Sequence, residues 1–302
     1  MADPIFRPGA TALITGGASG IGFAVAQLCR AKKMNLILVD VHAERLANAH
    51  IILGETEDTQ TLIHVMDTAD LSSWDYLKGK VAELFPDGVD FFMLNAGAAF
   101  RPAVAGRPWE DPEYFGKTFA TNVTGIINGL STFLPVVTDP NNKEERAIVI
   151  TGSKQGITNP PGNPAYNASK SAVKTITEHL AHDLRSNEET SNVSVHLLVP
   201  GWTYTSLTGS GGIVPDASKP EGAWAPAQVA DYMVDKVVKG DFYIICPDNE
   251  TTESMDEARM AWAMGDLMER RPPLSRWDGK WKEQAAKWIK SEAEKRADAR
   301  VA

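Results

Sequence analysis

The sequence predicts an α/β fold, a doubly wound parallel sheet of seven strands with helices on both faces and a helical extension at its C-terminal end. Short apolar runs alternate with helical patterns over the first two hundred residues. Several of these runs are apolar on both faces, as expected for strands that helices cover on each side. A glycine-rich turn, TGGASGIG at 15–22, lies between the first run and the first helix. We therefore expect one large domain built around a central sheet.

The apolar runs are the expected strands, and the segments between them are the expected helices. The strands are predicted at 10–15, 35–40, 62–67, 89–94, 146–151, 193–199 and 241–247. The helices between the first six strands are predicted at 20–32, 43–54, 71–85, 112–137 and 164–187. A further helix closed by Gly240 precedes the seventh strand. This alternation predicts parallel strands joined by right-handed crossovers.

Residues 205–226 interrupt the alternation. Gly, Ser and Pro dominate this segment, which predicts a loop. It follows the sixth strand closely, so we expect it to border a substrate cavity. Its glycines, Gly209, Gly211 and Gly212, would permit the motion of a lid.

The chain after the last strand is longer than a seven-stranded domain needs. We expect a helix near 251–269, the breaker RPP at 271–273 and a final helix near 278–297. In that last part, the spacing of Trp277, Trp281 and Trp288 predicts one helical face, which we interpret as a docking face. The predicted organisation is a catalytic domain over 1–250 and an extension over 251–302 that packs on the same or a neighbouring subunit.

Composition and charge exclude several classes of function. The formal net charge is −9 and the pI is near 5.2, so we expect neither nucleic acid nor an anionic membrane as a partner. The sequence contains no apolar run of about 18 residues, so we predict no membrane span. The N-terminus lacks the pattern of a secretory signal, which favours a cytoplasmic protein with reduced thiols at Cys29 and Cys246. These two cysteines fit no metal spacing, and no metal site is predicted.

The glycine turn predicts a dinucleotide site of the Rossmann type. Gly16, Gly17, Gly20 and Gly22 lie between a strand and a helix. There they let the backbone approach a pyrophosphate, and the helix N-terminus supplies free N–H donors. The alternative from this pattern alone is a glycine-rich turn that binds nothing.

Asp40, at the end of the second predicted strand, indicates which dinucleotide the site prefers. A carboxylate there accepts hydrogen bonds from an adenosine ribose and repels a 2′-phosphate. No Arg or Lys lies in the glycine turn or directly after Asp40. We predict NAD (NADH), with NADP as the less favoured alternative. Asp40 is also placed to cap a helix, and it is able to serve both roles. Asp67 ends the third strand in an analogous position.

Tyr166 and Lys170, in PAYNASKSAV, lie one helical turn apart on one face. A free Tyr has a pKa of about 10, too high for a base at neutral pH. A neighbouring ammonium favours the phenolate and lowers that pKa. The pair therefore fits a proton-transfer role, although an ordinary solvated edge has the same spacing.

Six motifs in register resemble one family. They are TGGASGIG at 15–22, NAG at 95–97, TNVTG at 121–125, TGS at 151–153, YNASK at 166–170 and PGWTYT at 200–205. Their order and spacing are similar to those of the short-chain dehydrogenase/reductase family, in its single-domain branch. The resemblance covers about residues 8–246.

The resemblance implies a role for each matching residue. Tyr166 would be the acid and base, and Lys170 would hold the nicotinamide ribose and lower the tyrosine pKa. Ser153 would hydrogen-bond the substrate oxygen, and Asn122 would hold a water that links Lys170 to a proton path. Besides Tyr166 and Lys170, the implied cofactor contacts are Gly16, Ser19, Gly20, Ile21, Gly22, Asp40, Asp67, Thr68, Asn95, Ala96, Gly97, Pro200, Gly201, Thr203 and Thr205.

The substrate end carries fewer signals. Gln155 and Asn163 lie between Ser153 and Tyr166 and are candidates for polar substrate contacts. Trp202, Tyr204 and Trp224 are candidates for an aromatic wall, with packing against the core as the alternative.

The leading hypothesis is an NAD-dependent oxidoreductase that interconverts a secondary alcohol and a ketone, acting on a small molecule as a homodimer or homotetramer. One alternative is an NAD(H)-binding scaffold or sensor without turnover. Another is a family member that does non-redox chemistry, such as a cyclase, and uses the cofactor structurally.

Overall fold

The computed structural model describes residues 4–208, 219–248 and 251–301. It confirms the predicted fold, a seven-stranded sheet in the order β3-β2-β1-β4-β5-β6-β7 with every paired neighbour parallel. The strands are β1 (Thr11–Thr15), β2 (Asn35–Asp40), β3 (Thr61–Val65), β4 (Phe91–Leu94), β5 (Arg146–Thr151), β6 (Val193–Val199) and β7 (Tyr243–Ile245). The order reverses between β1 and β4, where such folds bind ligands outside the carboxyl ends of the strands.

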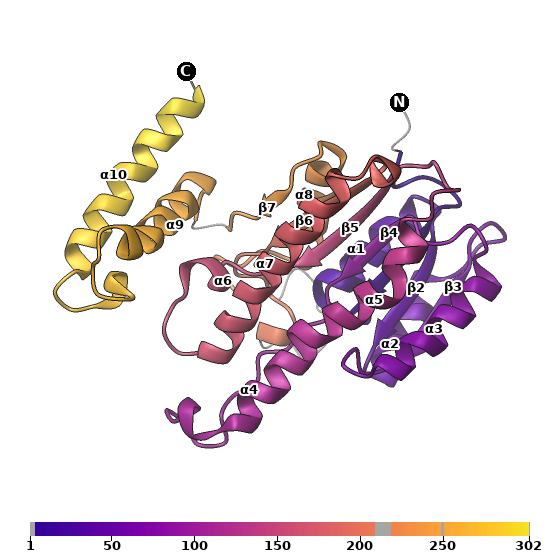
Figure 1. The fold of residues 1–302 in the computed structure, drawn as a ribbon, viewed down its shortest axis with the longest axis horizontal. Helices are drawn as coiled ribbons and strands as arrows, with labels where there is room; N and C mark the ends of the chain where they lie inside the picture. Colours follow the sequence, from indigo (N-terminus) through magenta and orange to yellow (C-terminus); the bar gives the residue numbers. More distant parts are fainter. Residues whose placement is uncertain (1–3, 209–218, 249–250, 302) are drawn as a thin grey trace.

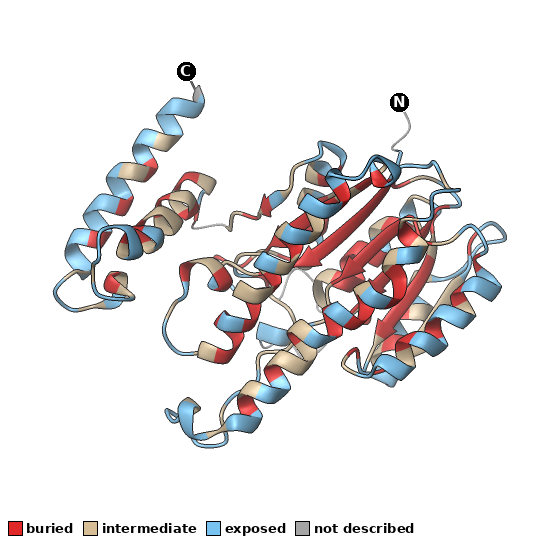
Figure 2. Cartoon of the chain, in the orientation of Figure 1, coloured by how far each residue is buried: buried red, intermediate tan, exposed pale blue. Residues whose placement is uncertain are grey.

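Helices cover both faces of the sheet (Figure 1). α1 (Gly20–Ala31), α2 (Ala43–Leu53) and α8 (Pro226–Val238) pack on one face, and α3 (Leu71–Leu84), α5 (Gly125–Val137) and α7 (Pro164–Arg185) pack on the other. The alternation of side chains along β1 explains this division, because Ala12 and Ile14 join the first core cluster and Leu13 joins the second. Figure 2 shows the central strands buried throughout.

The predicted helix over 112–137 is interrupted. α4 (Pro112–Phe119) is followed by a π-helical turn, Ala120–Thr124, before α5 begins. The hydrophobic periodicity of the sequence does not reveal the π-helical turn. One inserted residue leaves the spacing of apolar residues nearly unchanged between α4 and α5. Turns of this kind occur frequently at functional sites, and this one carries the buried Asn122.

The 205–226 segment is a loop where it is described, except for a short 3-10 helix, Ser206–Thr208. A backbone bridge between Thr203 and Trp224 draws its two ends together. Gly209, Gly211 and Gly212, which we expected to permit lid motion, lie outside the described residues.

The C-terminal extension forms two helices beside the main body (Figure 1). α9 (Glu253–Met268) and α10 (Lys282–Val301) share a small core of Ala258, Trp262, Ala285, Ile289 and Ala293. The prediction that three tryptophans share one helical face is wrong, because α10 begins only at Lys282. Trp277 instead ends a 3-10 helix, Ser275–Trp277, and Trp281 precedes α10.

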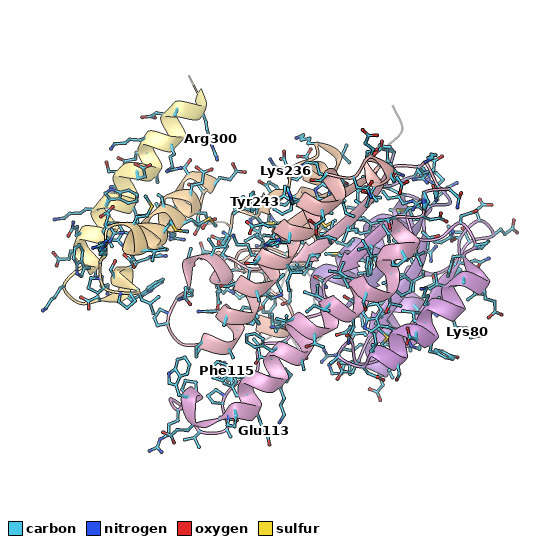
Figure 3. The ribbon with its side chains drawn as sticks, in the orientation of Figure 1. Lys80, Glu113, Phe115, Lys236, Tyr243 and Arg300 are labelled. Atoms are coloured by element: carbon cyan, nitrogen blue, oxygen red, sulfur yellow. The ribbon has the colours of Figure 1, made fainter. Side chains whose placement is uncertain are left out.

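The extension is joined to the main body by polar contacts and by α6 (Gln155–Thr158), which packs against α9. Tyr232 on α8 donates a hydrogen bond to Glu253 at 2.5 Å. Within the extension, Arg300, labelled near the end of α10 in Figure 3, joins α10 to α9 by pairing with Glu253 at 2.6 Å and with Glu257 at 2.5 Å. No helix of the described segments is long and apolar enough to cross a membrane.

Candidate active site

A cavity of about 870 Å³ lies at the carboxyl ends of the strands. It brings together most of the residues that the sequence singled out: Gly16, Ser19, Gly20, Ile21, Asp40, Asp67, Thr68, Asn95, Ala96, Gly97, Ser153, Gln155, Asn163, Tyr166, Lys170, Pro200, Gly201, Trp202, Thr203 and Thr205. Five predicted residues do not line it, namely Gly22, Asn122, Tyr204, Gly17 and Trp224. The first two support the lining from behind, whereas Tyr204 donates its backbone N–H to the Trp224 carbonyl at 3.0 Å.

The glycine turn forms a phosphate-sized cradle at one end of the cavity. Gly16 has φ +65°, a left-handed conformation that favours glycine. A Cβ on Gly22 would lie 2.3 Å from the Gly16 carbonyl oxygen, so only glycine lets α1 start this close to the turn. The first turn of α1 holds no acidic residue, and its N-cap Ser19 makes no side-chain capping bond. The helix end is therefore free to bind an anion such as a pyrophosphate.

Asp40 lies directly against the glycine turn. Its carboxylate accepts hydrogen bonds from the backbone N–H groups of Ala18 at 3.2 Å and His42 at 3.1 Å. It thus joins the glycine turn to the start of α2 and keeps further lone pairs for a ligand. Arg45, one turn into α2, also lines this end of the cavity. The sequence reading missed Arg45 because it considered only the residues directly after Asp40.

Asn95 connects the ends of three strands. Its backbone N–H donates to Thr15 Oγ1 at 2.9 Å, and its side-chain Nδ2 donates to the Thr15 carbonyl at 3.1 Å. Thr151 at the end of β5 donates to Asn95 Oδ1 at 3.1 Å. These bonds hold β1, β4 and β5 in register where the cavity floor is formed.

Tyr166, Ser153 and Lys170 meet at the other end of the cavity. Tyr166 and Lys170 are both buried, at 8% and 3% exposure, although each carries a polar end. The Lys170 ammonium donates to the Thr151 carbonyl at 2.7 Å and lies 5.9 Å from the centroid of the Tyr166 ring. Burial lowers the pKa of Lys170 to about 8. Burial raises the pKa of Tyr166, and a hydrogen bond with Ser153 acts in the opposite direction.

Asn122 lies behind this group, in the π-helical turn. Its Oδ1 accepts from the Ala98 N–H at 2.8 Å, and its Nδ2 donates to the Ala98 carbonyl at 2.9 Å and to Ser169 Oγ at 3.0 Å. Both amide donors are therefore occupied, and a water held by this side chain would have to donate to Oδ1. A Cβ on Gly97 would be 3.4 Å from both Asn122 Oδ1 and Lys170 Nζ, which shows how closely these groups approach.

The substrate end has a polar and an apolar side. Asn163 caps α7 by accepting from the Tyr166 N–H at 3.2 Å, and its oxygen also accepts from the Tyr114 hydroxyl, so its amide nitrogen remains for a substrate. Trp202 lines the cavity and is 47% exposed. Trp224 instead packs on the core and against Tyr232, with ring centroids 5.8 Å apart. The wall also contains Phe100 and Leu207, which carried no signal in the sequence.

Lys154 is a further wall residue that the sequence reading missed. Its ammonium lies 2.5 Å from Asp256 on α9 and 3.4 Å from Asp248 after β7. Only the folded chain brings these three residues together.

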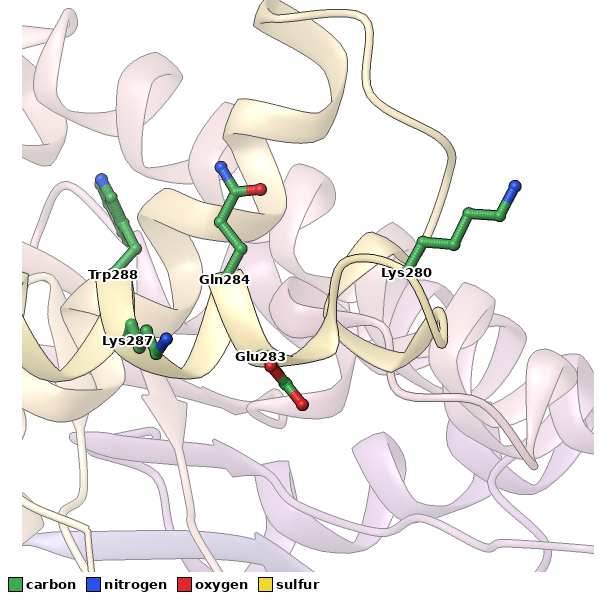
Figure 4. A pocket seen from close by; sticks show the side chains of 5 residues that line it. All are labelled: Lys280, Glu283, Gln284, Lys287 and Trp288. Atoms are coloured by element: carbon green, nitrogen blue, oxygen red, sulfur yellow. The ribbon is translucent and has the colours of Figure 1, made fainter.

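A second hollow lies on α10 (Figure 4). Lys280, Glu283, Gln284, Lys287 and Trp288 line it. It is open to solvent and holds no buried polar group, so it lacks the features of a built binding site. The described residues contain no cluster of three metal-ligating side chains.

The comparisons with known proteins agree with this geometry. Residues 10–212 match the model of the family described as short chain dehydrogenase. A sulfoacetaldehyde reductase from Chromohalobacter salexigens is 33% identical over 65% of this chain and 73% of its own. An NADP-dependent (R)-specific alcohol dehydrogenase from Lentilactobacillus kefiri is 28% identical over 66% of this chain and 75% of its own.

A solved short chain dehydrogenase/reductase from Burkholderia phymatum, in complex with NAD, superimposes with a TM-score of 0.75. It is 27% identical, and the match covers 90% of this chain and 98% of that chain. The coverage includes part of the C-terminal extension as well as the sheet. The chain therefore belongs to the short-chain dehydrogenase family, whose members are oxidoreductases that use a nicotinamide cofactor.

Proposed function

We propose that this chain is an NAD-dependent enzyme that interconverts a secondary alcohol and a ketone, with Tyr166 as the acid and base. One observation carries the proposal. Tyr166, Ser153 and Lys170 meet at one end of a cavity whose other end holds the glycine turn and Asp40. The reacting end and the adenosine end of a dinucleotide would therefore both find complementary groups in one cavity.

The residues of this end divide the work of proton transfer. A bound nicotinamide would donate or accept the hydride. Tyr166 protonates the ketone oxygen in reduction, and its burial favours the neutral phenol that this step needs. In oxidation it must act as phenolate, which the Ser153 hydrogen bond and the positive charge of Lys170 favour. Ser153 donates to the substrate oxygen, where charge develops.

The activity is tested by mixing the protein with NADH and a panel of ketones and following NADH absorbance. Tyr166→Phe should reduce the rate by roughly 10²–10⁴-fold while NADH binding, measured by fluorescence, stays within about threefold. Full activity of this variant would refute the role of Tyr166 as acid and base. Tight NADH binding with no turnover on any alcohol or ketone would favour a scaffold or sensor, and a product of unchanged mass would favour non-redox chemistry.

The preference for NAD rests on Asp40. Its carboxylate offers acceptors to the ribose hydroxyls and repels a 2′-phosphate, whereas Arg45 at the same end would attract one. Both cofactors occur among the similar proteins, because the Lentilactobacillus kefiri enzyme is named as NADP-dependent and the Burkholderia phymatum structure contains NAD. Asp40→Asn removes the charge and keeps an acceptor for only one of the Ala18 and His42 N–H groups, because these two groups donate to different carboxylate oxygens. The loss of the charge should improve NADPH binding relative to NADH. Equal use of both cofactors by the unmodified protein would contradict the proposal.

We also propose that the enzyme acts in the cytoplasm on a small-molecule substrate and assembles as a homodimer or homotetramer. Support for assembly comes from α9, where Met264, Leu267 and Met268 are 59%, 78% and 76% exposed. Their spacing of three and four residues puts them on one apolar face of the helix. Light scattering coupled to gel filtration tests it, and a monomer at micromolar concentration would refute it.

A further inference from the structure

An ion pair between Lys154 and the extension lies in the wall of the cavity that Ser153 and Tyr166 also line. Lys154 follows Ser153 in the chain, and its side chain lines the cavity. Its ammonium lies 2.5 Å from Asp256 and 3.4 Å from Asp248. All three side chains are largely withdrawn from solvent, at 14%, 2% and 13% exposure. Their electrostatic interactions are therefore screened far less than those of surface pairs.

The surrounding backbone holds this group tightly. A Cβ on Gly201 would lie 2.8 Å from both Lys154 Nζ and Asp248 Oδ2, so the cluster packs against the segment that follows β6. On its far side Asp256 faces Arg259 at 3.9 Å, and Arg259 also donates to Thr251 Oγ1 at 3.1 Å. Burial raises the pKa of Asp256, and the contact with Lys154 opposes this shift.

The other cations of the described cavity wall have different positions. Arg45 lies with Asp40 at the adenosine end, and Lys170 is buried beneath Tyr166 with its ammonium on the Thr151 carbonyl. Lys154 is the third cation of this wall, and the two carboxylates that it contacts carry one more negative charge than its ammonium neutralises. Phe100, Trp202, Leu207, Gln155 and Asn163, which are uncharged, also line the cavity.

We propose that Lys154, Asp248 and Asp256 form a specificity-determining cluster, in which two carboxylates, one of them on the C-terminal extension, more than neutralise the Lys154 ammonium in the cavity wall, so that the enzyme selects uncharged ketones with an apolar body over anionic ones. This inference rests on the proposed function, because it concerns the substrate of that reaction. This preference contrasts with that of the sulfoacetaldehyde reductase from Chromohalobacter salexigens, since sulfoacetaldehyde is an anion at neutral pH.

The test uses two ketones of nearly equal shape, 4-acetylbenzoate and 4-acetylbenzamide, with NADH and the full chain. The measured quantity is the ratio of their kcat/KM values, carboxylate over carboxamide. We expect a ratio of about 0.1 or less for the unmodified protein. Removing one carboxylate with Asp256→Asn or Asp248→Asn should raise the ratio roughly tenfold, as expected for one unit charge at about 8 Å and an effective dielectric of about 30.

Two further variants isolate the cause. Glu257 lies on the same helix as Asp256, but its carboxylate pairs with Arg296 and Arg300 and not with Lys154. Glu257→Gln should therefore leave the ratio within twofold. In Lys154→Met/Asp256→Asn the gain should disappear, because the cation that attracts the carboxylate is gone. Asp248→Asn keeps the test valid if the substitution at the more buried Asp256 prevents folding.

The binding of the two ketones is also measured by thermal shift in the presence of NAD, which needs no turnover. If no ketone is reduced, the proposed function fails, while the binding ratio still tests the specificity-determining cluster. The proposal is overturned if neither Asp256→Asn nor Asp248→Asn changes the ratio more than Glu257→Gln does. It is also overturned if the gain persists without Lys154.

Discussion

Lys170 should make the folded protein less stable at neutral pH than at mildly alkaline pH, and replacing it with Met should remove this dependence. Its ammonium is buried, and its pKa falls from 10.5 to about 8. Between these two values the unfolded chain binds more protons than the folded chain. The free energy of unfolding therefore rises with pH across this window, and the penalty is fully present below about pH 8.

The size of the effect follows from the shift in pKa. A difference of about 2.5 units corresponds to about 3 kcal/mol of destabilisation at pH 7. Lys170→Met removes this penalty and also removes the hydrogen bond to the Thr151 carbonyl, at a cost of about 1–2 kcal/mol. The variant should be more stable than the unmodified protein by about 1–2 kcal/mol at pH 7, although it should be inactive.

Urea denaturation without cofactor at pH 7, 8, 9 and 9.5 measures this difference. Lys174→Met is the matched control, because Lys174 lies one turn further along α7 and is partly exposed in an ion pair with Glu178. The control should stay within about 0.5 kcal/mol of the unmodified protein at each pH. A constant gap between the unmodified protein and Lys170→Met from pH 7 to 9.5 would refute the reasoning.

Three other predictions concern packing, the extension and the adenosine end. Gly156→Ala places a Cβ 2.6 Å from the Lys170 backbone, so the free energy of unfolding from circular-dichroism melting should fall by about 1–3 kcal/mol. The control Gly116→Ala, on α4 where a Cβ meets no atom within 4 Å, should be neutral or stabilising, and equal melting points of the two variants would contradict the prediction. Tyr232→Phe removes the hydrogen bond to Glu253, so limited proteolysis should cleave 251–302 faster than in the control Tyr243→Phe, whose lost hydroxyl bonds Glu178 on α7. Equal cleavage rates would show that the Tyr232 bond does not anchor the extension. Arg45→Ala should weaken NADPH binding at least about threefold and leave NADH binding within twofold; a larger loss for NADH would place Arg45 on a group common to both cofactors.

The order of the elements was predictable because local patterns encode it. The double-sided apolar runs of β2 and β6 have the same bounds in the sequence reading and in the structure. The glycine turn was recognisable for a similar reason, since a left-handed Gly16 and a crowded Gly22 tolerate no other residue well. The π-helical turn at 120–124 was not predictable, because one extra residue within a continuous helical pattern leaves the apolar spacing nearly unchanged. The division into 1–250 and 251–302 remains a prediction.

By itself the sequence determined the fold class and the family, and it singled out Ser153, Tyr166 and Lys170 as candidates, because short motifs and their spacing carry that information along the chain. Only the tertiary structure decided what surrounds them. Burial sets the direction of the pKa shifts of Tyr166 and Lys170, and burial depends on how α7 packs against the sheet. The contact of Lys154 with Asp256 joins residues far apart in the chain, so no local pattern records it. The path of the folded chain brings these distant residues together, and it puts the C-terminal extension against the wall of the candidate active site.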